Sequence, residues 1–311
     1  MKVFDMHCDT LLRCLESNQT ESLISNDFHV SFENMKRGHY LAQVFACFVD
    51  TGTTNSPYEL CNKMIDQFYL DVEGSDDVRF AGNYDDLMDN IKDNKLTAML
   101  SIEEGAAIEG SLEKLKHFYN RGIRFITLTW NYENEIGYPN YKYEHQHKGL
   151  KPFGIETVEA MNDLGIIVDV SHLSDAGFYD VLKVSKKPFV ATHSNSRSLH
   201  EHPRNLTDDM IKQLGNTGGV TGINYVAGFL GNHDLARAED VVQQMKHIVD
   251  KGGIEVCSIG SDFDGCKTPE LKLQDAAHVP YLLDLMSKEF TDDEIDQITY
   301  KNIMRVIKET L

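Results

Sequence analysis

Short apolar, β-branched runs alternate with amphipathic stretches along the whole chain. A short continuous apolar run bounded by turn residues is typical of a strand that is buried on both faces. On this basis we expect eight buried strands, at residues 3–6, 42–49, 97–102, 123–129, 165–171, 188–192, 218–226 and 255–261.

The stretches between these runs carry apolar residues at helical spacing. Pro57 stands where a helix begins, Ser111 is a typical N-cap, and Gly122 ends a helix before the fourth strand. The rest of residues 10–40 is expected to be a long polar connection. The expected helices are residues 32–37, 58–72, 84–94, 111–120, 155–164, 175–184, 207–214, 238–251, 281–290 and 292–310.

Eight strands alternating with helices predict an α/β fold, a single (β/α)8 barrel of the TIM type over residues 1–311. The alternation also allows a doubly wound open sheet. The barrel is favoured because no Gly-rich phosphate-binding fingerprint follows the first strand, and because polar residues stand at the ends of many strands. The C-terminal ends of barrel strands face one mouth, so these polar residues are expected to meet there.

The first strand ends in the pair His7 and Asp9. Side chains two residues apart on a strand point the same way, so an imidazole nitrogen and a carboxylate oxygen would converge just beyond the strand end. Such a pair is half of a metal site, although a chance surface pair is the alternative for so short a pattern. Cys8 lies between the two and is expected to point to the opposite face, into packing.

Four more polar residues end later strands, namely Glu103, His172, His193 and Asp262. Histidine and carboxylate ligands suit zinc or a similar divalent ion, and a carboxylate between two ions can bridge them. Two metals about 4 Å apart would hold a hydroxide at neutral pH and polarise a carbonyl. Asp262 would then accept the water's proton and pass it to a leaving amine. The pattern therefore predicts metal-assisted hydrolysis.

The formal charge of −19 argues against nucleic acid or an anionic membrane surface as a partner, since no basic run offsets repulsion from phosphates. A small-molecule substrate fits better. The chain opens directly into the first strand without a signal-peptide pattern and has no run of about 20 apolar residues, so we expect a cytoplasmic protein. Its six cysteines form no C-x-x-C and suggest no disulfide framework.

Taken together, the motifs resemble the membrane dipeptidase (renal dipeptidase) family of zinc peptidases, in the manner of a bacterial-type cytoplasmic member. The resemblance extends over nearly the full length, and it implies a (β/α)8 barrel that binds two zinc ions and hydrolyses dipeptides. The motifs that carry it are H-C-D-T at residues 7–10, I-E-E-G at 102–105, G-L-K-P-F-G at 149–154, D-V-S-H at 169–172, T-H-S-N at 192–195 and G-S-D-F-D-G at 260–265.

The resemblance implies a role for each matching residue. It makes His7 and Asp9 ligands of the first zinc, Glu103 the bridging carboxylate, and His172 and His193 ligands of the second zinc.

The same resemblance also decides between two adjacent glutamates and implies a role for two further positions. Glu103 is preferred to Glu104 as the bridge because it matches the first position of the family's E-G-G. Arg204 matches the arginine that pairs with the substrate's terminal carboxylate, a bidentate task suited to guanidinium. Without the resemblance, a surface arginine is the simpler interpretation of Arg204. Asp262 matches the catalytic carboxylate near the bridging water.

One position departs from the family pattern. Better known members have a histidine after L-T on the fourth strand, which helps hold the substrate, whereas this chain has Trp130. Indole donates one hydrogen bond but does not titrate or ligate, so the departure concerns the substrate range and rate more than the metal site. A substrate-facing role and a core role both stay open for Trp130. The family's secretion signal and lipid-anchor tail are absent from the sequence, and the resemblance allows a homodimer.

The leading hypothesis is a zinc-dependent dipeptidase that uses a metal-bridged hydroxide and whose substrates include dipeptides with a C-terminal D-residue. A second hypothesis is a related barrel hydrolase, such as a cyclic amidase or a deaminase. A carboxylate clamp at Arg204 serves a dipeptide and not a base, so this residue discriminates between the two. A third hypothesis is a metal-binding relative without turnover, which only Trp130 supports.

Overall fold

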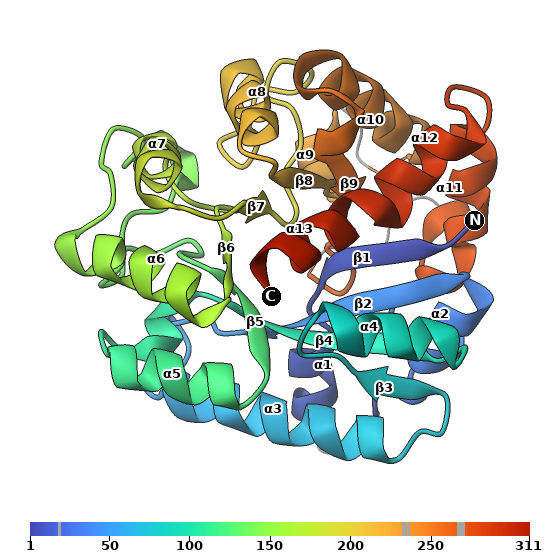
Figure 1. Cartoon of the computed structure of the whole chain (residues 1–311), viewed down its shortest axis with the longest axis horizontal. Helices are drawn as coiled ribbons and strands as arrows, with labels where there is room; N and C mark the ends of the chain where they lie inside the picture. The colour runs from blue at the N-terminus through green and yellow to red at the C-terminus, as the bar shows by residue number, and fades with distance from the viewer. Residues whose placement is uncertain (18–19, 232–234, 236, 266–270) are drawn as a thin grey trace.

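The computed structural model describes residues 1–17, 20–231, 235, 237–265 and 271–311. Within these residues eight parallel strands close into a barrel, because β1 pairs with both β2 and β9 while β2 pairs with β4 (Figure 1). The predicted (β/α)8 barrel is therefore confirmed. Around the barrel the strands are β1 (Val3–Cys8), β2 (Tyr40–Phe48), β4 (Leu96–Glu103), β5 (Ile123–Thr127), β6 (Ile167–Asp169), β7 (Val190–Ala191), β8 (Val220–Ile223) and β9 (Cys257–Ile259).

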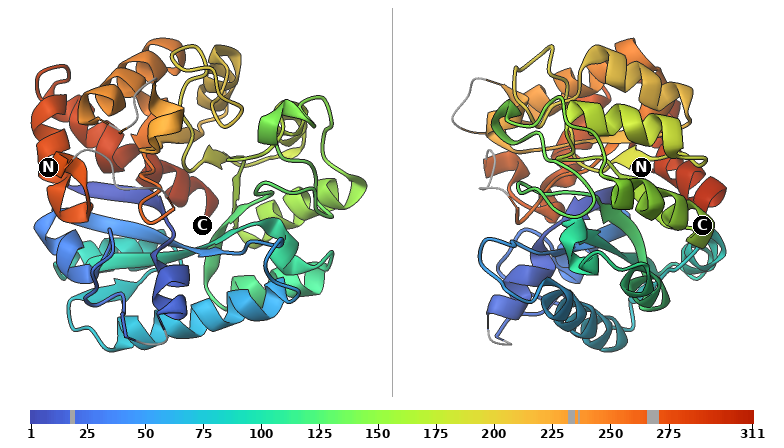
Figure 2. Two further views of the ribbon diagram at one scale, coloured as in Figure 1. Left: turned by 180° about the vertical axis from the view of Figure 1, so that it is seen from behind. Right: turned by 90° about the vertical axis from the view of Figure 1, so that its left-hand side faces the viewer.

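The helices lie around the outside of the barrel, as Figures 1 and 2 show. Every expected helix is present, and α1 and α9 occupy stretches where no helix is expected. The last predicted helix is continuous through a π-helical turn at Gln297–Lys301. The helices are α1 (Thr10–Glu16), α2 (Phe32–Arg37), α3 (Pro57–Glu73), α4 (Tyr84–Lys92), α5 (Leu112–Asn120), α6 (Pro152–Leu164), α7 (Asp175–Val184), α8 (Asp208–Asn216), α9 (Ala227–Leu230), α10 (Ala238–Gly252), α11 (Val279–Met286), α12 (Asp292–Asp296) and α13 (Asn302–Thr310).

A short additional strand, β3 (Val78–Phe80), pairs with the first residues of β4 and stays outside the closed barrel. The hydrophobic pattern does not predict it, because only three residues pair and the middle one, Arg79, is exposed. An exposed arginine between two apolar residues gives too short an alternation to identify a strand.

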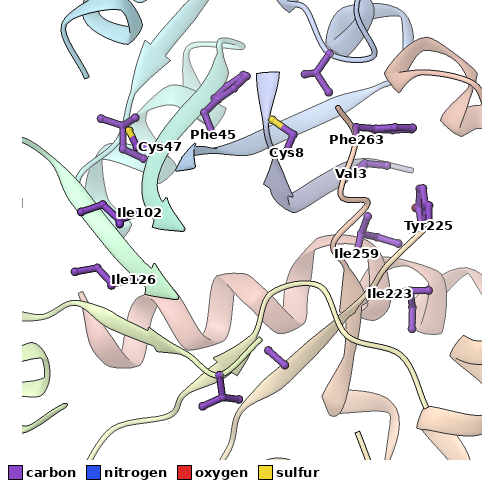
Figure 3. Packing of buried hydrophobic residues seen from close by; sticks show 14 of the residues in the cluster. Val3, Cys8, Phe45, Cys47, Ile102, Ile126, Ile223, Tyr225, Ile259 and Phe263 are labelled. Carbon is purple, nitrogen blue, oxygen red and sulfur yellow. The ribbon is translucent and has the colours of Figure 1, made fainter. Parts of the chain in front are cut away.

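Two clusters of buried side chains hold the barrel together. The outer cluster packs one face of the strands against the surrounding helices, and Figure 3 shows part of it. The inner cluster includes Phe4, Met6 and Met99 from the strands together with Ile303 and Val306 of α13. Helix α13 lies across the centre of the barrel in Figure 1 and covers one end of it. Within the described residues, no helix is long and apolar enough to cross a lipid bilayer.

Glycine lets the backbones of β8 and of the residue after β9 approach the residue after β7 closely. A Cβ atom added at Gly260 would lie 1.7 Å from the carbonyl oxygen of Thr192, and one added at Gly222 would lie 2.1 Å from the same atom. Real Cβ atoms do not approach backbone this closely, so the strands would have to separate.

We therefore expect Gly260→Ala to lower the free energy of unfolding by about 1–3 kcal/mol, the usual cost of overpacking a well-packed interior. Denaturant unfolding of the purified protein measures the change. Gly228→Ala is the matched control, because a Cβ atom there meets no atom of the described residues within 4 Å. Equal effects of the two substitutions would contradict the close approach at Gly260.

Candidate metal centre and active site

Six polar side chains from the C-terminal ends of five strands meet at the mouth of the barrel. All six are buried although each is titratable. The pattern of strand ends predicted this meeting, and the structure places every one of the six there. They are His7 and Asp9 from β1, Glu103 from β4, His172 from the loop after β6, His193 from the loop after β7, and Asp262 from the loop after β9.

The carboxylate of Glu103 is the centre of the group. Its Oε2 lies 3.3 Å from Nε2 of His7, and its Oε1 lies 3.1 Å from Nε2 of His172 and 3.5 Å from Nε2 of His193. The two oxygens of the Glu103 carboxylate therefore face different histidines. A carboxylate that bridges two metal ions needs this arrangement.

The first-strand pair points into the same space. Nε2 of His7 lies 3.5 Å from Oδ2 of Asp9 and 3.9 Å from Oδ1 of Asp262. Ligand atoms of two trios lie within 4.8 Å of one another, one formed by His7, Glu103 and His193 and the other by His7, Asp9 and Asp262. Among the described residues, His172 contacts Glu103 without belonging to either trio.

The tautomers of two histidines show that these residues fit a cation. The hydroxyl of Thr192 donates its one hydrogen to Asp169 at 2.6 Å, so at 2.8 Å it accepts from Nδ1 of His193. Nδ1 of His172 likewise donates to the side-chain amide oxygen Oδ1 of Asn131 at 3.2 Å. Each Nε2 then turns a lone pair toward Glu103, and two electron-rich atoms at this distance need a positive charge between them.

Unpartnered atoms support the same conclusion. Nε2 of His7, Nε2 of His193 and Oδ1 of Asp9 are buried and have no hydrogen-bond partner among the described residues. Buried polar atoms in folded proteins are nearly always paired, so three exceptions in one small space point to a missing common partner. The donor set of imidazole nitrogens and carboxylate oxygens is the one that zinc takes.

Electrostatics also favour a bound cation. Burial raises the pKa of Asp9 well above its usual range, the charge of Glu103 raises it further, and burial likewise raises the pKa of Asp262. Burial opposes ionisation of Glu103 too, but the nearby charge of His7 holds its pKa well below the usual value. Crowded buried carboxylates destabilise one another, and a divalent cation among them would remove that cost.

A β-bulge directs His7 into the site. In β1 the residues Phe4 and Met6 face the inner cluster, so strict alternation would place Cys8 there as well. Cys8 instead packs in the outer cluster beside Phe45 (Figure 3). Between the paired positions at Asp5 and Cys8, β1 advances by three residues while β2 advances by only two. The extra residue reverses the alternation and turns His7 toward the mouth, a common use of bulges beside functional sites.

Neighbouring groups fix the side chains of the cluster in place. Asp169, fully buried, accepts hydrogen bonds from the hydroxyls of Thr127 and Thr192 at 2.6 Å and so orients the loop that carries His193. Asp262 accepts from the Asn224 amide at 2.8 Å. The backbones of His172 and Asp262 are left-handed, with φ of 67° and 60°. Such backbone in a residue other than glycine costs energy and is concentrated at functional sites.

Glu104 lies outside the group. Its carboxylate accepts hydrogen bonds from the backbone N–H groups of Ala106 and Trp130, both at 2.9 Å, and from the amide of Asn134. Burial raises the pKa of Glu104 to about 7. The two adjacent glutamates therefore have different surroundings, one among the histidines and the other holding the loop after β5.

A cavity of about 430 Å³ opens above the group. Asp9, Glu103, His172 and Asp262 reach its wall, and Trp130 lines it too. The residues that line it and that the hydrophobic pattern did not single out include Leu12, Arg13 and Glu16 of α1, Phe48, Asn131, Val226 and Phe229. The leucines at helical spacing after Asp9 could have indicated α1. The other lining residues come from distant parts of the sequence and become neighbours only once the barrel closes.

Arg204 lies beside this cavity, behind His172, and is buried. Its Nη2 donates to the carbonyl oxygen of His193 at 3.4 Å, while Nε and Nη1 have no hydrogen-bond partner in the part of the chain that the structure describes. Burial lowers its pKa to about 10 even though Asp262 and Glu103 oppose the shift. A buried guanidinium with two unused donor atoms is prepared to bind an anionic group.

Comparison with known proteins agrees with this arrangement. The sequence model described as membrane dipeptidase, peptidase family M19, matches residues 1–311. An uncharacterized dipeptidase of Schizosaccharomyces pombe is 30% identical, over 99% of this chain and 80% of that protein. A protein of Klebsiella pneumoniae encoded 5′ of pqqA is 32% identical, over 71% of this chain and 85% of that protein.

Solved structures share the fold. The metallopeptidase dipeptidase AC superposes with a TM-score of 0.92 at 24% identity, over 100% of this chain and 98% of that chain. A metallopeptidase of Rhodobacter sphaeroides, liganded with a phosphinate mimic of the dipeptide L-Ala-D-Ala, gives a TM-score of 0.92 at 23% identity, over 100% of this chain and 99% of that chain. With the family match over the full length, the chain belongs to the membrane dipeptidase family, peptidase family M19, and is a metallo-dipeptidase.

Proposed function

We propose that residues 1–311 act as one domain that binds two zinc ions and hydrolyses dipeptides, including dipeptides with a C-terminal D-residue. The observation that carries the proposal is the Glu103 carboxylate, whose two oxygens lie 3.1–3.5 Å from the Nε2 atoms of three buried histidines. We assign His7 and Asp9 to one ion, His172 and His193 to the other, and Glu103 to both.

The metal pair, when bound, would polarise the scissile carbonyl and lower the pKa of a water molecule. The side chains supply the remaining functions. Asp262 has its Oδ2 held by Asn224 and its Oδ1 turned toward the cluster, so Oδ1 is placed to take a proton from water and return it to the leaving amine. Burial raises the pKa of Asp262, which makes it a better base.

Arg204 and Trp130 are assigned to the substrate. The two unpartnered donor atoms of Arg204 fit the terminal carboxylate of a dipeptide, and Trp130 lines the cavity above the metal ligands. The direct test is hydrolysis of L-Ala-L-Ala and L-Ala-D-Ala by zinc-loaded protein. We expect both to be cleaved, and the fully zinc-loaded protein failing on every dipeptide of a broad panel would exclude the proposal.

We expect Arg204→Ala to raise KM for dipeptides by about 10–100-fold, because a hydrogen bond to a charged group contributes about 1.5–3 kcal/mol. Steady-state kinetics on a dipeptide and on its C-terminal amide measure the effect. The amide lacks the carboxylate, so its hydrolysis should change little. Arg204→Lys should recover only part of the affinity, because an ammonium group does not form the bidentate pair. Equal losses on the acid and the amide would contradict the carboxylate assignment.

A further inference from the structure

Two aromatic side chains form part of the wall of the cavity. Phe48, the last residue of β2, and Trp130, after β5, meet edge to face with ring centroids 4.9 Å apart. Both are half-buried and both line the cavity, and Leu12 of α1 lines it with them. We call Phe48, Trp130 and Leu12 the apolar slot.

Contacts with neighbouring residues hold Trp130 of the slot in place. The backbone N–H of Trp130 donates to the buried carboxylate of Glu104 at 2.9 Å, and the indole also packs on Tyr132 and His172 with centroids 5.7 and 6.2 Å away. An indole that is already held in place costs a ligand little ordering entropy, and aromatic faces favour aromatic or large apolar partners.

The strand order tells which end of a dipeptide meets the slot. In the closed barrel β2 is four strands away from β7 in either direction, so Phe48 lies across the mouth from the loop that follows β7 and carries Arg204. Glu103 of β4 and His7 of β1 lie between the two sides. A dipeptide whose carboxylate binds Arg204 and whose amide lies over Glu103 therefore directs its N-terminal residue toward the slot.

The charges around the slot suit an N-terminal residue. Glu16 of α1, one helical turn after Leu12, lines the same cavity, and its carboxylate complements an α-ammonium group. We propose that the apolar slot selects dipeptides whose N-terminal residue has an aromatic or large apolar side chain. This inference rests on the proposed dipeptidase function and names the substrate class of that site.

The test compares kcat/KM of zinc-loaded protein on three dipeptides, Phe-Ala, Ala-Phe and Ala-Ala. We expect the parent to prefer Phe-Ala to Ala-Ala by at least about tenfold, the usual discrimination of an apolar pocket. Trp130→Ala should lower kcat/KM on Phe-Ala far more than on Ala-Ala and so remove most of that preference, whereas Trp130→Phe should keep it. Should Trp130→Ala fail to fold, Phe48→Ala serves the same purpose. Tyr141→Ala, which removes an exposed ring outside the cavity lining, is the matched control.

The outcomes separate two kinds of failure. If the parent cleaves dipeptides but shows no preference for Phe-Ala, or if the Trp130 variant loses activity equally on all three, the slot assignment is wrong and the dipeptidase proposal stands. If the variant loses Ala-Phe selectively, the slot holds the C-terminal residue and the inference is overturned. If the parent cleaves no dipeptide, both proposals fall together.

Discussion

Asp262→Asn is expected to keep the zinc content of the parent and to lower kcat by about 10²–10⁴-fold, the usual contribution of a positioned acid or base. The amide is nearly isosteric with the carboxyl and keeps the contact with Asn224, but it does not take a proton from water. Elemental analysis and turnover of one preparation measure both quantities. Asp66→Asn is a control with a largely exposed side chain on α3.

The alternative for Asp262 is ligation, because its Oδ1 belongs to a trio with His7 and Asp9. The same measurement decides between the roles. Loss of zinc together with activity would make Asp262 a metal ligand, and full activity would exclude it as the proton carrier.

Glu103→Gln is expected to lose zinc and, with it, at least about 10²-fold in turnover, since a metal ion supplies several kcal/mol of transition-state stabilisation. The oxygen of a carboxamide binds a metal ion more weakly than a carboxylate oxygen does. The second carboxylate oxygen is replaced by an NH₂ group, which donates hydrogen bonds and does not bind the metal. Its nitrogen would face at least one of the three histidines that lie 3.1–3.5 Å from Glu103.

Glu104→Gln is the matched control for this substitution, one residue away on the chain. Its carboxylate binds the backbone of Ala106 and Trp130 and the amide of Asn134, and none of these belongs to the metal cluster. We expect Glu104→Gln to retain zinc. If both variants kept their zinc, the bridging role of Glu103 would be excluded.

Strand ends could be located from the sequence because a parallel barrel buries its strands on both faces. The apolar run at residues 123–129 predicted β5, and the polar residues after the runs predicted the cluster at the mouth. The lengths of the strands were harder to predict. The run at 165–171 yields a strand only at Ile167–Asp169, because apolar character reports burial, and burial continues into the loop that carries His172.

The orientation of His7 could not be predicted from the alternation of side chains along a strand. Alternation along an ideal strand separates His7 from Phe4 and Met6, and only the bulge between Asp5 and Cys8 turns it to the mouth. No local pattern marks that bulge. The structure agrees with the prediction that His7 and Asp9 converge and that Cys8 packs in the core. The bulge that produces this arrangement could not be predicted from the sequence.

Contacts between distant segments were the least predictable part. Phe48 and Trp130 are 82 positions apart and become neighbours only through closure of the barrel. The short helix α1 was also missed, because its seven residues follow a metal-ligand motif at once and lie in a stretch that is polar overall. Both features form the cavity wall, so substrate selectivity was harder to infer than the metal ligands.

The central claim is a zinc pair held by Glu103 and the three histidines that acts on dipeptides. Elemental analysis of protein purified without chelator, paired with dipeptide hydrolysis by the same sample, tests it most directly. We predict two zinc ions per chain, with turnover that a chelator abolishes and added zinc restores. Protein that cleaves dipeptides at full rate without bound metal, or that binds no metal at all, would contradict the account.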